Sequence, residues 1–117
     1  MIIDKRQHEN LTILDVKGAI QLGESAQAFS QTLENVLRAE GTNVVIDFTG
    51  INYIDSTGVG ELIGYLSKFS AKERQVMLVN PSERVRKLLK LAHLDPIFKI
   101  FPDEGSAVAY LQSRESA

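Results

Sequence analysis

Residues 44–60 read Val-Val-Ile-Asp-Phe-Thr-Gly-Ile-Asn-Tyr-Ile-Asp-Ser-Thr-Gly-Val-Gly, and this stretch decides the fold class. Its first five residues, 44–48, are rich in β-branched side chains and nearly continuously apolar, which is typical of a central strand covered by other elements. Its last residues open an apolar stripe at helical spacing, formed by Val59, Leu62, Ile63, Leu66 and Phe69. The stretch therefore predicts a buried strand that passes into an amphipathic helix through a short polar turn.

The segments on either side alternate strand and helix patterns. Strand patterns cover residues 2–7, 11–17, 76–79 and 97–101, with a turn at Glu9-Asn10 and a loop punctuated by Gly18 and Gly23. Helical patterns run from about Glu24 to a stop at Gly41, from about Ser56 to Ala71, from Ser82 through Ala92, and from Pro102-Asp103-Glu104 through Leu111, before a frayed tail over residues 113–117. Helical connections of a dozen or more residues imply parallel neighbouring strands, whereas the first two strands are close enough to pair as an antiparallel hairpin. We predict an α/β fold: a single domain over residues 1–117, with a mixed, mainly parallel β-sheet packed with about four helices.

Bulk composition excludes several classes of protein. The chain has 117 residues, which suits one domain, and its net charge of −2 gives no general attraction for nucleic acid or anionic lipid. It has no cysteine, so disulfides, thiolate metal sites and thiol catalysis are excluded. The N-terminus turns polar after three residues, and no apolar run approaches the ~20 residues that a membrane helix requires. We expect a cytoplasmic protein with no nucleic-acid partner and no direct membrane insertion.

The glycines of residues 58–64 resemble the dinucleotide fingerprint G-x-G-x-x-G, but the third glycine comes one position late. The next strand ends at Val79-Asn80-Pro81 without the acidic residue that the fingerprint requires, and no Gly-Lys-Ser/Thr triplet forms a P-loop. We interpret Gly58 and Gly60 instead as residues that let the first helical turn approach the neighbouring backbone closely. No cofactor is predicted.

Asp47, at the end of the central strand, is a candidate phosphoryl acceptor of the receiver-domain type. That chemistry also needs an acidic cluster for magnesium and a lysine after a later strand, and Lys72 lies in a helix tail instead. We interpret Asp47 as a strand-end residue that accepts hydrogen bonds from a loop over residues 49–54. His8 and His93 are isolated and have no ligand-like partner at helical spacing, so no metal site is predicted.

Serine hydrolase chemistry is not indicated either, because the motif Gly-x-Ser-x-Gly is missing. One helix face is basic, with Arg84, Arg86, Lys87 and Lys90. Such a face is usually a solvated surface, although it is also suited to an acidic partner. The sequence predicts no catalytic residue, and we expect a protein that is not an enzyme.

The turn Asp55-Ser56-Thr57-Gly58 has two interpretations that use the same geometry. In the structural interpretation, Asp55 or Ser56 caps the helix by accepting a hydrogen bond from an unpaired N–H of the first turn. In the functional interpretation, an exposed hydroxyl at the positive end of the helix dipole is phosphorylated there. A phosphate adds about −1.5 to −2 charges, which switches the binding of a partner without unfolding the domain.

The two halves of the opening stretch, residues 44–51 and 53–60, resemble the signature of the STAS domain, the family of bacterial anti-sigma factor antagonists. The resemblance extends to Val16-Lys17-Gly18, Leu78-Val79-Asn80-Pro81, the helix over residues 85–91 and the last strand over residues 98–101. It implies a non-enzymatic switch protein, a monomer or weak dimer. In such proteins the unphosphorylated form binds an anti-sigma factor that is also a serine kinase with a histidine-kinase-like ATPase fold. Phosphorylation of the antagonist abolishes that binding, and a PP2C-type phosphatase restores it.

Residue by residue, the resemblance implies that Ser56 is the phosphorylation site and that Thr57 is a less favoured second acceptor. The partner-binding residues that it implies are Gln21, Asp55, Ser56, Thr57, Gly58, Val59, Gly60 and Glu61. Gln21 departs from the family pattern, because many antagonists carry an acidic residue at that position. An alternative within the same family is a structural STAS module, either a stressosome-like scaffold component or an accessory subunit of a lipid transporter.

Overall fold

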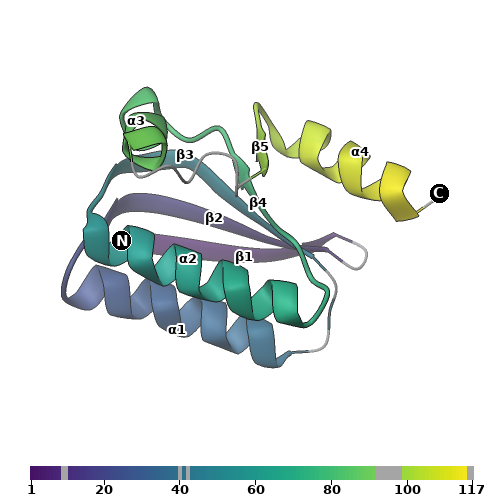
Figure 1. Ribbon diagram of the computed structural model, residues 1–117, viewed down its shortest axis with the longest axis horizontal. Helices are drawn as coiled ribbons and strands as arrows, with labels where there is room; N and C mark the ends of the chain where they lie inside the picture. The colour runs from purple at the N-terminus through teal and green to yellow at the C-terminus, as the bar shows by residue number, and fades with distance from the viewer. Residues whose placement is uncertain (9–10, 40, 42, 92–98, 116–117) are drawn as a thin grey trace.

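The computed structural model describes residues 1–8, 11–39, 41, 43–91 and 99–115 and contains a mixed five-stranded sheet flanked by helices (Figure 1). The elements are β1 (Ile2–His8), β2 (Leu11–Ile20), α1 (Glu24–Arg38), β3 (Val44–Ile54), α2 (Ser56–Ala71), β4 (Val76–Val79), α3 (Glu83–Leu91), β5 (Lys99–Phe101) and α4 (Glu104–Glu115). The strands lie side by side in the order β1-β2-β3-β4-β5; β1 is antiparallel to β2, and the other neighbours are parallel. The predicted fold class, with an antiparallel hairpin beside parallel strands, is confirmed.

Helices cover the two faces of the sheet unequally. The crossovers through α1, α2 and α3 all progress in one direction along the sheet, so their common right hand places the three helices on the same face. The larger core fills the space beneath them and is built from residues such as Phe29, Phe48, Leu62, Phe69 and Val85, all almost completely buried. The helix α4 lies across the opposite face (Figure 1), where Ala107 and Leu111 pack on residues of β2, β3 and β4. Ser56, at the start of α2, therefore belongs to an element held by the larger core.

Two strands are at least three residues longer than the sequence predicts. β2 continues through Gly18 to Ile20, and β3 continues through residues 49–54, which we expected to form a loop. These extensions pair with each other, with Lys17 opposite Gly50 and Gly18 opposite Ile51, across two register shifts. Gly18 adopts φ 111°, a conformation that favours glycine, and so continues the strand instead of ending it. The pairing carries the chain to the very start of α2.

Several element ends also differ from the prediction. α1 ends at Arg38, followed by an extended Ala39, and not at Gly41. α4 continues to Glu115, four residues beyond the predicted end at Leu111, because its last residues contain no helix breaker. Residues 113–115 are thus helical, whereas we expected a frayed tail. The predicted turn at residues 9–10, the helical residue Ala92 and the strand residues 97–98 lie outside the described part of the chain.

One charged residue, Arg74, is buried beneath α1. It is only 8% exposed, and its guanidinium donates to the carbonyl oxygens of Val36, Leu37 and Ala39 at 3.1–3.4 Å. These carbonyls belong to the C-terminal end of α1, where backbone acceptors have no partner within the helix. The guanidinium also stacks on the Phe69 ring of α2 at 4.7 Å, so Arg74 joins α1 and α2 at their C-terminal ends, away from the start of α2.

Candidate functional site

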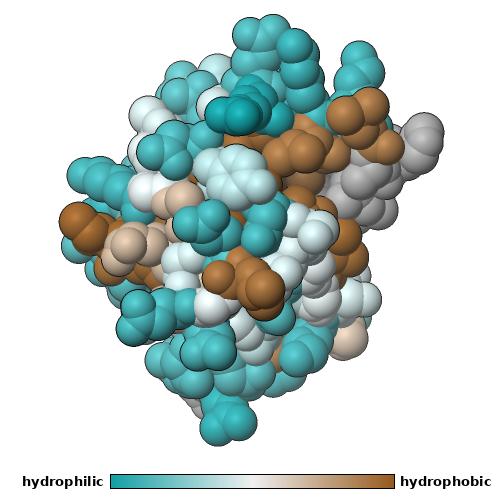
Figure 2. Space-filling model, turned by 90° about the vertical axis from the view of Figure 1, so that its left-hand side faces the viewer, coloured by the Kyte–Doolittle hydropathy of each residue, from teal (hydrophilic) through white to brown (hydrophobic). Residues whose placement is uncertain are grey.

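The turn between β3 and α2 lies at the carboxyl ends of the parallel strands. β2 ends at Ile20, β3 at Ile54 and β4 at Val79, and the three strands are parallel neighbours. Residues 21–23, Asp55 and residues 80–82 consequently gather at one edge of the sheet, the edge seen in Figure 2. In open α/β sheets, ligands bind outside the carboxyl ends of the strands.

Asp55 is the residue that organises the turn. Its backbone is extended, and its Oδ1 accepts a hydrogen bond from the Gly58 amide at 2.9 Å, which makes it the N-cap of α2. Its Oδ2 accepts from the Leu22 amide at 2.8 Å and so ties the β2–α1 loop to the helix start. The amides of Gly58 and Leu22, in that order, stabilise the carboxylate and lower the pKa of Asp55. Of the two capping residues that the sequence allows, Asp55 and not Ser56 fills the position.

Ser56 is the first residue of α2 and is exposed. Since Asp55 supplies the cap, the Ser56 hydroxyl is not needed to satisfy the helix end. Thr57 is half-buried and lines a hollow of about 540 Å³ between α1 and α2. The two neighbouring hydroxyls thus differ in surroundings: Ser56 is presented to solvent, and Thr57 faces a neighbouring helix.

Gly58 and Gly60 also differ, and the prediction that both serve close packing is right for only one of them. A Cβ added to Gly58 would lie 2.7 Å from a side-chain carbon of Ile54 and 2.8–2.9 Å from atoms of Ile20, so this position admits no side chain. A Cβ added to Gly60 would meet nothing within 4 Å. Gly58 is buried and Gly60 exposed, so Gly60 has no packing role within the chain.

The contact of Gly58 with two isoleucine side chains also bears on the nucleotide alternative. A glycine in a phosphate-binding loop leaves space for a ligand. The space beside Gly58 is instead filled by Ile54 and Ile20, at the ends of β3 and β2. Beside it, Val59 is half-buried against the larger core, and Glu61 is half-buried on the rim of the hollow that Thr57 lines.

Gln21 lies on the neighbouring loop. Its backbone amide donates to Ser25 Oγ at 2.9 Å, and its carbonyl accepts from the same hydroxyl at 3.0 Å, so its main chain helps to start α1. The residue is exposed. The hydrogen bond between Leu22 and Asp55 brings this loop against the start of α2, and the structure thereby places all eight predicted partner-binding residues at one edge.

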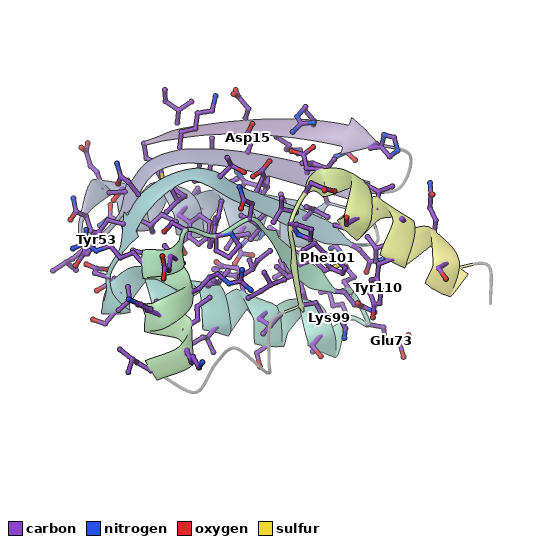
Figure 3. All side chains as sticks on the ribbon, turned by 90° about the horizontal axis from the view of Figure 1, so that it is seen from above. Asp15, Tyr53, Glu73, Lys99, Phe101 and Tyr110 are labelled. Carbon is purple, nitrogen blue, oxygen red and sulfur yellow. The ribbon has the colours of Figure 1, made fainter. Side chains whose placement is uncertain are left out.

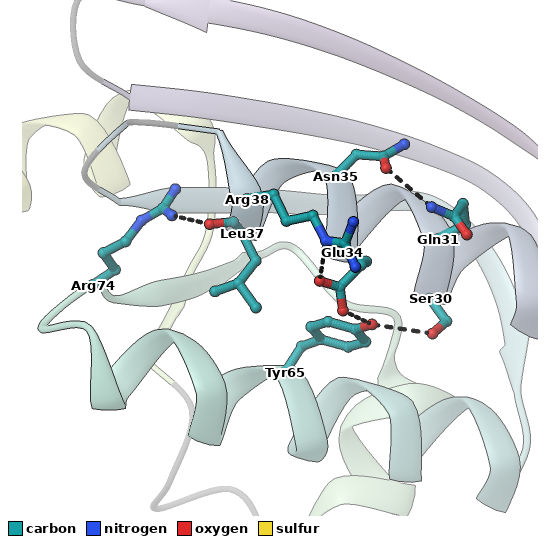
Figure 4. A network of polar contacts seen from close by, with 8 residues as sticks. All are labelled: Ser30, Gln31, Glu34, Asn35, Leu37, Arg38, Tyr65 and Arg74. Atoms are coloured by element: carbon teal, nitrogen blue, oxygen red, sulfur yellow. Dashed lines mark hydrogen bonds and ion pairs between the residues drawn. The ribbon is translucent and has the colours of Figure 1, made fainter.

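The hollow between α1 and α2 is bounded at its far end by a polar network (Figure 4). Tyr65 Oη donates to Glu34 Oε1 at 3.0 Å, and Arg38 Nε donates to Glu34 Oε2 at 3.0 Å. The hydrogen bond from Tyr65, followed by the one from Arg38, lowers the pKa of Glu34. The network joins α1 to α2, the helix that carries Thr57.

Asp47 accepts hydrogen bonds from the Thr49 amide at 2.9 Å and from Thr49 Oγ1 at 2.6 Å, as predicted, although residues 49–54 form strand and not loop. Burial favours the neutral acid, but hydrogen bonding with Glu104 and Thr49 outweighs it and lowers the pKa of Asp47. Alternation along β3 puts Asp47 on the face that α4 covers, together with Val45 and away from α2. Asp47 is therefore not part of the site around Ser56.

Two remaining sequence candidates lie elsewhere. His8 is exposed on the edge strand β1, and His93 falls outside the described residues. Within the ranges that the structure describes, no three histidine, aspartate or glutamate side chains are grouped so as to hold a metal ion. Nor does any helix there combine the length and the apolar character that crossing a bilayer requires.

Two exposed apolar residues of this edge are not among the eight predicted partner-binding residues. Leu22 is 79% exposed, and Tyr53 is 37% exposed. The guanidinium of Arg84 lies 5.8 Å from the centroid of the Tyr53 ring, which links α3 to the segment before Ser56. The sequence offers one signal for Leu22, an apolar residue between the polar Gln21 and the loop residue Gly23; the approach of Arg84 depends on the tertiary fold.

Known proteins resemble this chain in both sequence and fold. The sequence profile of the STAS domain matches residues 3–107. The anti-sigma-B factor antagonist of Listeria monocytogenes is 29% identical over 103 residues, which cover 88% of this chain and 89% of that protein.

Solved structures of low sequence identity share the fold. An anti-sigma factor antagonist from Mycobacterium paratuberculosis superposes with a TM-score of 0.86 at 22% identity, covering 95% of this chain and 93% of that one. The antagonist SpoIIAA has been solved in both an unphosphorylated and a phosphorylated form. The unphosphorylated form has a TM-score of 0.81 at 20% identity and covers 96% and 97% of the two chains; the phosphorylated form has a TM-score of 0.75 at 18% identity and covers 94% and 99%.

Proposed function

This chain belongs to the STAS domain family, and from that premise we propose that it is an anti-sigma factor antagonist controlled by phosphorylation of Ser56. The unphosphorylated protein binds an anti-sigma factor that is also a serine kinase with a histidine-kinase-like ATPase fold. Binding releases the sigma factor, the kinase phosphorylates Ser56, and a PP2C-type phosphatase returns the protein to its binding form. The antagonist acts in the cytoplasm by binding and performs no catalysis itself.

The observation that carries this proposal is the division of roles between Asp55 and Ser56. Asp55 caps α2 through the Gly58 amide, which leaves Ser56 exposed at the first helical position with its hydroxyl free for another use. A phosphate on this hydroxyl would lie at the positive end of the α2 dipole, where the added charge is tolerated by the fold. Phosphorylation can thus change the binding surface and leave the domain folded.

Family relatives support the partner half of the proposal. The Listeria monocytogenes relative is named as an antagonist of an anti-sigma factor, and the match spans most of both chains. The existence of a phosphorylated form of SpoIIAA, which shares this fold, supports the regulatory half.

The proposal is tested in two steps with the full chain. First, the tagged protein is isolated from the cells that encode it, and its partner is identified by mass spectrometry. A kinase-type anti-sigma factor is the expected partner, whereas a membrane transporter ATPase would favour the accessory-subunit alternative. Second, the purified kinase and ATP are added, and the phosphate is located by peptide mass spectrometry.

Phosphate is expected on Ser56, with none on the Ser56→Ala variant and an unchanged signal on Thr57→Ala. A kinase that binds the chain but adds no phosphate to Ser56 or Thr57 would overturn the regulatory half of the proposal.

A further inference from the structure

The exposed side of α3 carries a concentrated positive charge that the proposed phosphorylation does not use. Its four cations, Arg84, Arg86, Lys87 and Lys90, are all exposed, and we refer to them as the α3 basic surface. With its single acid Glu83, the nine-residue helix has a net charge of +3 in a chain whose net charge is −2, so the remaining residues carry −5. The surface is a local exception on an acidic domain.

Three of these cations surround a hollow. Arg86, Lys87 and Lys90 line a depression of about 670 Å³, together with residues 80–83 and Ile100. In the part of the chain that the structure describes, the ion pairs are Arg6 with Glu104 and Arg38 with Glu34, and none involves α3. Figure 2 shows hydrophilic residues gathered at the top of the molecule, where α3 lies in Figure 1. The charge of the α3 basic surface is therefore available to a partner.

The fourth cation connects this surface to the edge that presents Ser56. Arg84 lies over the ring of Tyr53, three residues before Ser56 in the chain, and Figure 3 shows Tyr53 at the same end of the molecule as α3. α2 and α3 follow the neighbouring parallel strands β3 and β4, so both helices begin at the same sheet edge. A protein seated on Ser56 would find the α3 basic surface next to it.

We propose that the α3 basic surface binds an acidic patch on the same anti-sigma factor that phosphorylates Ser56, so that the interface extends from α2 onto α3. This inference rests on the proposed function for the identity of the partner. The charge distribution favours a protein patch over nucleic acid or an anionic membrane. A long polyanion would also approach the remaining residues, whose net charge is −5, whereas a compact acidic patch would not.

Binding of the α3 basic surface to an acidic patch also explains how phosphorylation could switch the interaction through charge. Complementary charges at the rim of an interface accelerate association and exclude wrong partners. A phosphate on Ser56 adds negative charge at the sheet edge that the acidic patch must approach, so the same attraction that assembles the complex would be opposed after phosphorylation.

The test reverses charge at matched pairs of lysines in the full chain. The test variant is Lys87→Glu/Lys90→Glu, and the control variant is Lys5→Glu/Lys72→Glu, which changes the net charge equally at β1 and at the C-terminal end of α2. Each pair includes one lysine near a helix C-terminus, where a positive charge stabilises the helix: Lys90 in α3 and Lys72 after α2. The losses of helix stability are therefore matched. Thermal unfolding verifies that both variants are folded.

Binding to the purified anti-sigma factor is measured at about 0.05 M and about 0.5 M NaCl, since salt screens exposed charges. We expect the test variant to bind about tenfold more weakly than wild type at low salt, with the difference largely lost at high salt, and the control variant to bind like wild type. Phosphorylation of Ser56 should slow in the test variant in proportion to the lost affinity.

Three outcomes would overturn the inference. Equal binding by the test variant and wild type would show that the partner does not contact α3. An equal loss of affinity in the test and control variants would show that the net charge of the chain, and not the position of the lysines, determines binding. Binding of wild type to phosphatidylserine vesicles that is lost with Lys87→Glu/Lys90→Glu, in the absence of any effect on the anti-sigma factor, would reassign the surface to a membrane. If no anti-sigma factor binds wild type at all, the proposed function itself fails, which is a separate result.

Discussion

The two sides of the first turns of α2 obey different constraints. On the inner side Gly58 is pressed against Ile20 and Ile54, and no atom can be added there. On the outer side Ser56, Gly60 and Gly64 face solvent, and a Cβ added to either glycine would meet no atom within 4 Å beyond its own helix. Glycine in an exposed helix is unfavourable, so the outer side is not optimised for stability. The comparison separates residues that hold the turn in place from residues that are free to meet a partner.

The largest effect is expected from filling the inner side. Gly58→Ala places a Cβ within 2.7–2.9 Å of Ile54 and Ile20, including the Ile20 backbone oxygen, which cannot move without disturbing β2. We expect the free energy of unfolding to fall by about 2–3 kcal/mol, as for other overpacked sites. Urea unfolding measures the loss, and Gly64→Ala is the matched control in the same helix. A stability equal to that of wild type would show that α2 is not seated against the strand ends as described.

The next effect concerns binding and not stability. Ser56→Asp adds a negative charge to the exposed first residue of α2, whereas Ser56→Ala removes the hydroxyl without adding charge. We expect Ser56→Asp to weaken binding to the anti-sigma factor at least about tenfold, and Ser56→Ala to bind like wild type but to escape phosphorylation. Isothermal titration calorimetry compares the three proteins. Equal affinities for the Asp and Ala variants would argue against control by charge.

The sequence predicts the polar turn and the close packing of Gly58, but not which residue caps α2 or that Gly60 has no packing role, and the reason is physical. Hydroxyls after a buried strand are recognisable, because the strand and helix periods are both local patterns. The choice of Asp55 over Ser56 as the cap is not local, since Asp55 also accepts from Leu22, a residue 33 positions earlier in the chain. The extension of β3 through residues 49–54 depends on its pairing with β2, and Gly50 and Asn52 obscure it in the sequence. Gly58 and Gly60 look alike in the sequence, and only the positions of Ile20 and Ile54 distinguish them.

A pH-dependent effect tests how the two sides are joined at Asp55. The pKa of Asp55 is lowered in the folded protein by the amides of Gly58 and Leu22, so its contribution to stability is present above the unfolded-state pKa and is lost as the pH falls through the folded-state pKa. We expect Asp55→Asn to be less stable than wild type near neutral pH, by less than Gly58→Ala, and the difference to close on acidification. Unfolding curves from neutral pH down to the acid limit of folding, recorded for both proteins, cancel the contribution of the other carboxyl groups. A difference that does not change with pH would mean that the charge of Asp55 is irrelevant to the cap.

The smallest change sharpens the comparison most, because it should move stability and binding in opposite directions. Gly60→Ala adds a methyl group that meets nothing within 4 Å, so the gain in helix propensity should raise the free energy of unfolding by roughly 0.5–1 kcal/mol. If the partner packs closely on the outer side of α2, the same methyl group should weaken binding to the anti-sigma factor even though the domain is more stable. Gly64→Ala, one turn further from Ser56, provides a graded control: it should stabilise by a similar amount and disturb binding less. A Gly60→Ala variant that gains stability and keeps full affinity would show that the partner does not contact the outer side of α2 beyond Ser56. The charge at Ser56 would then act on a contact elsewhere at the sheet edge.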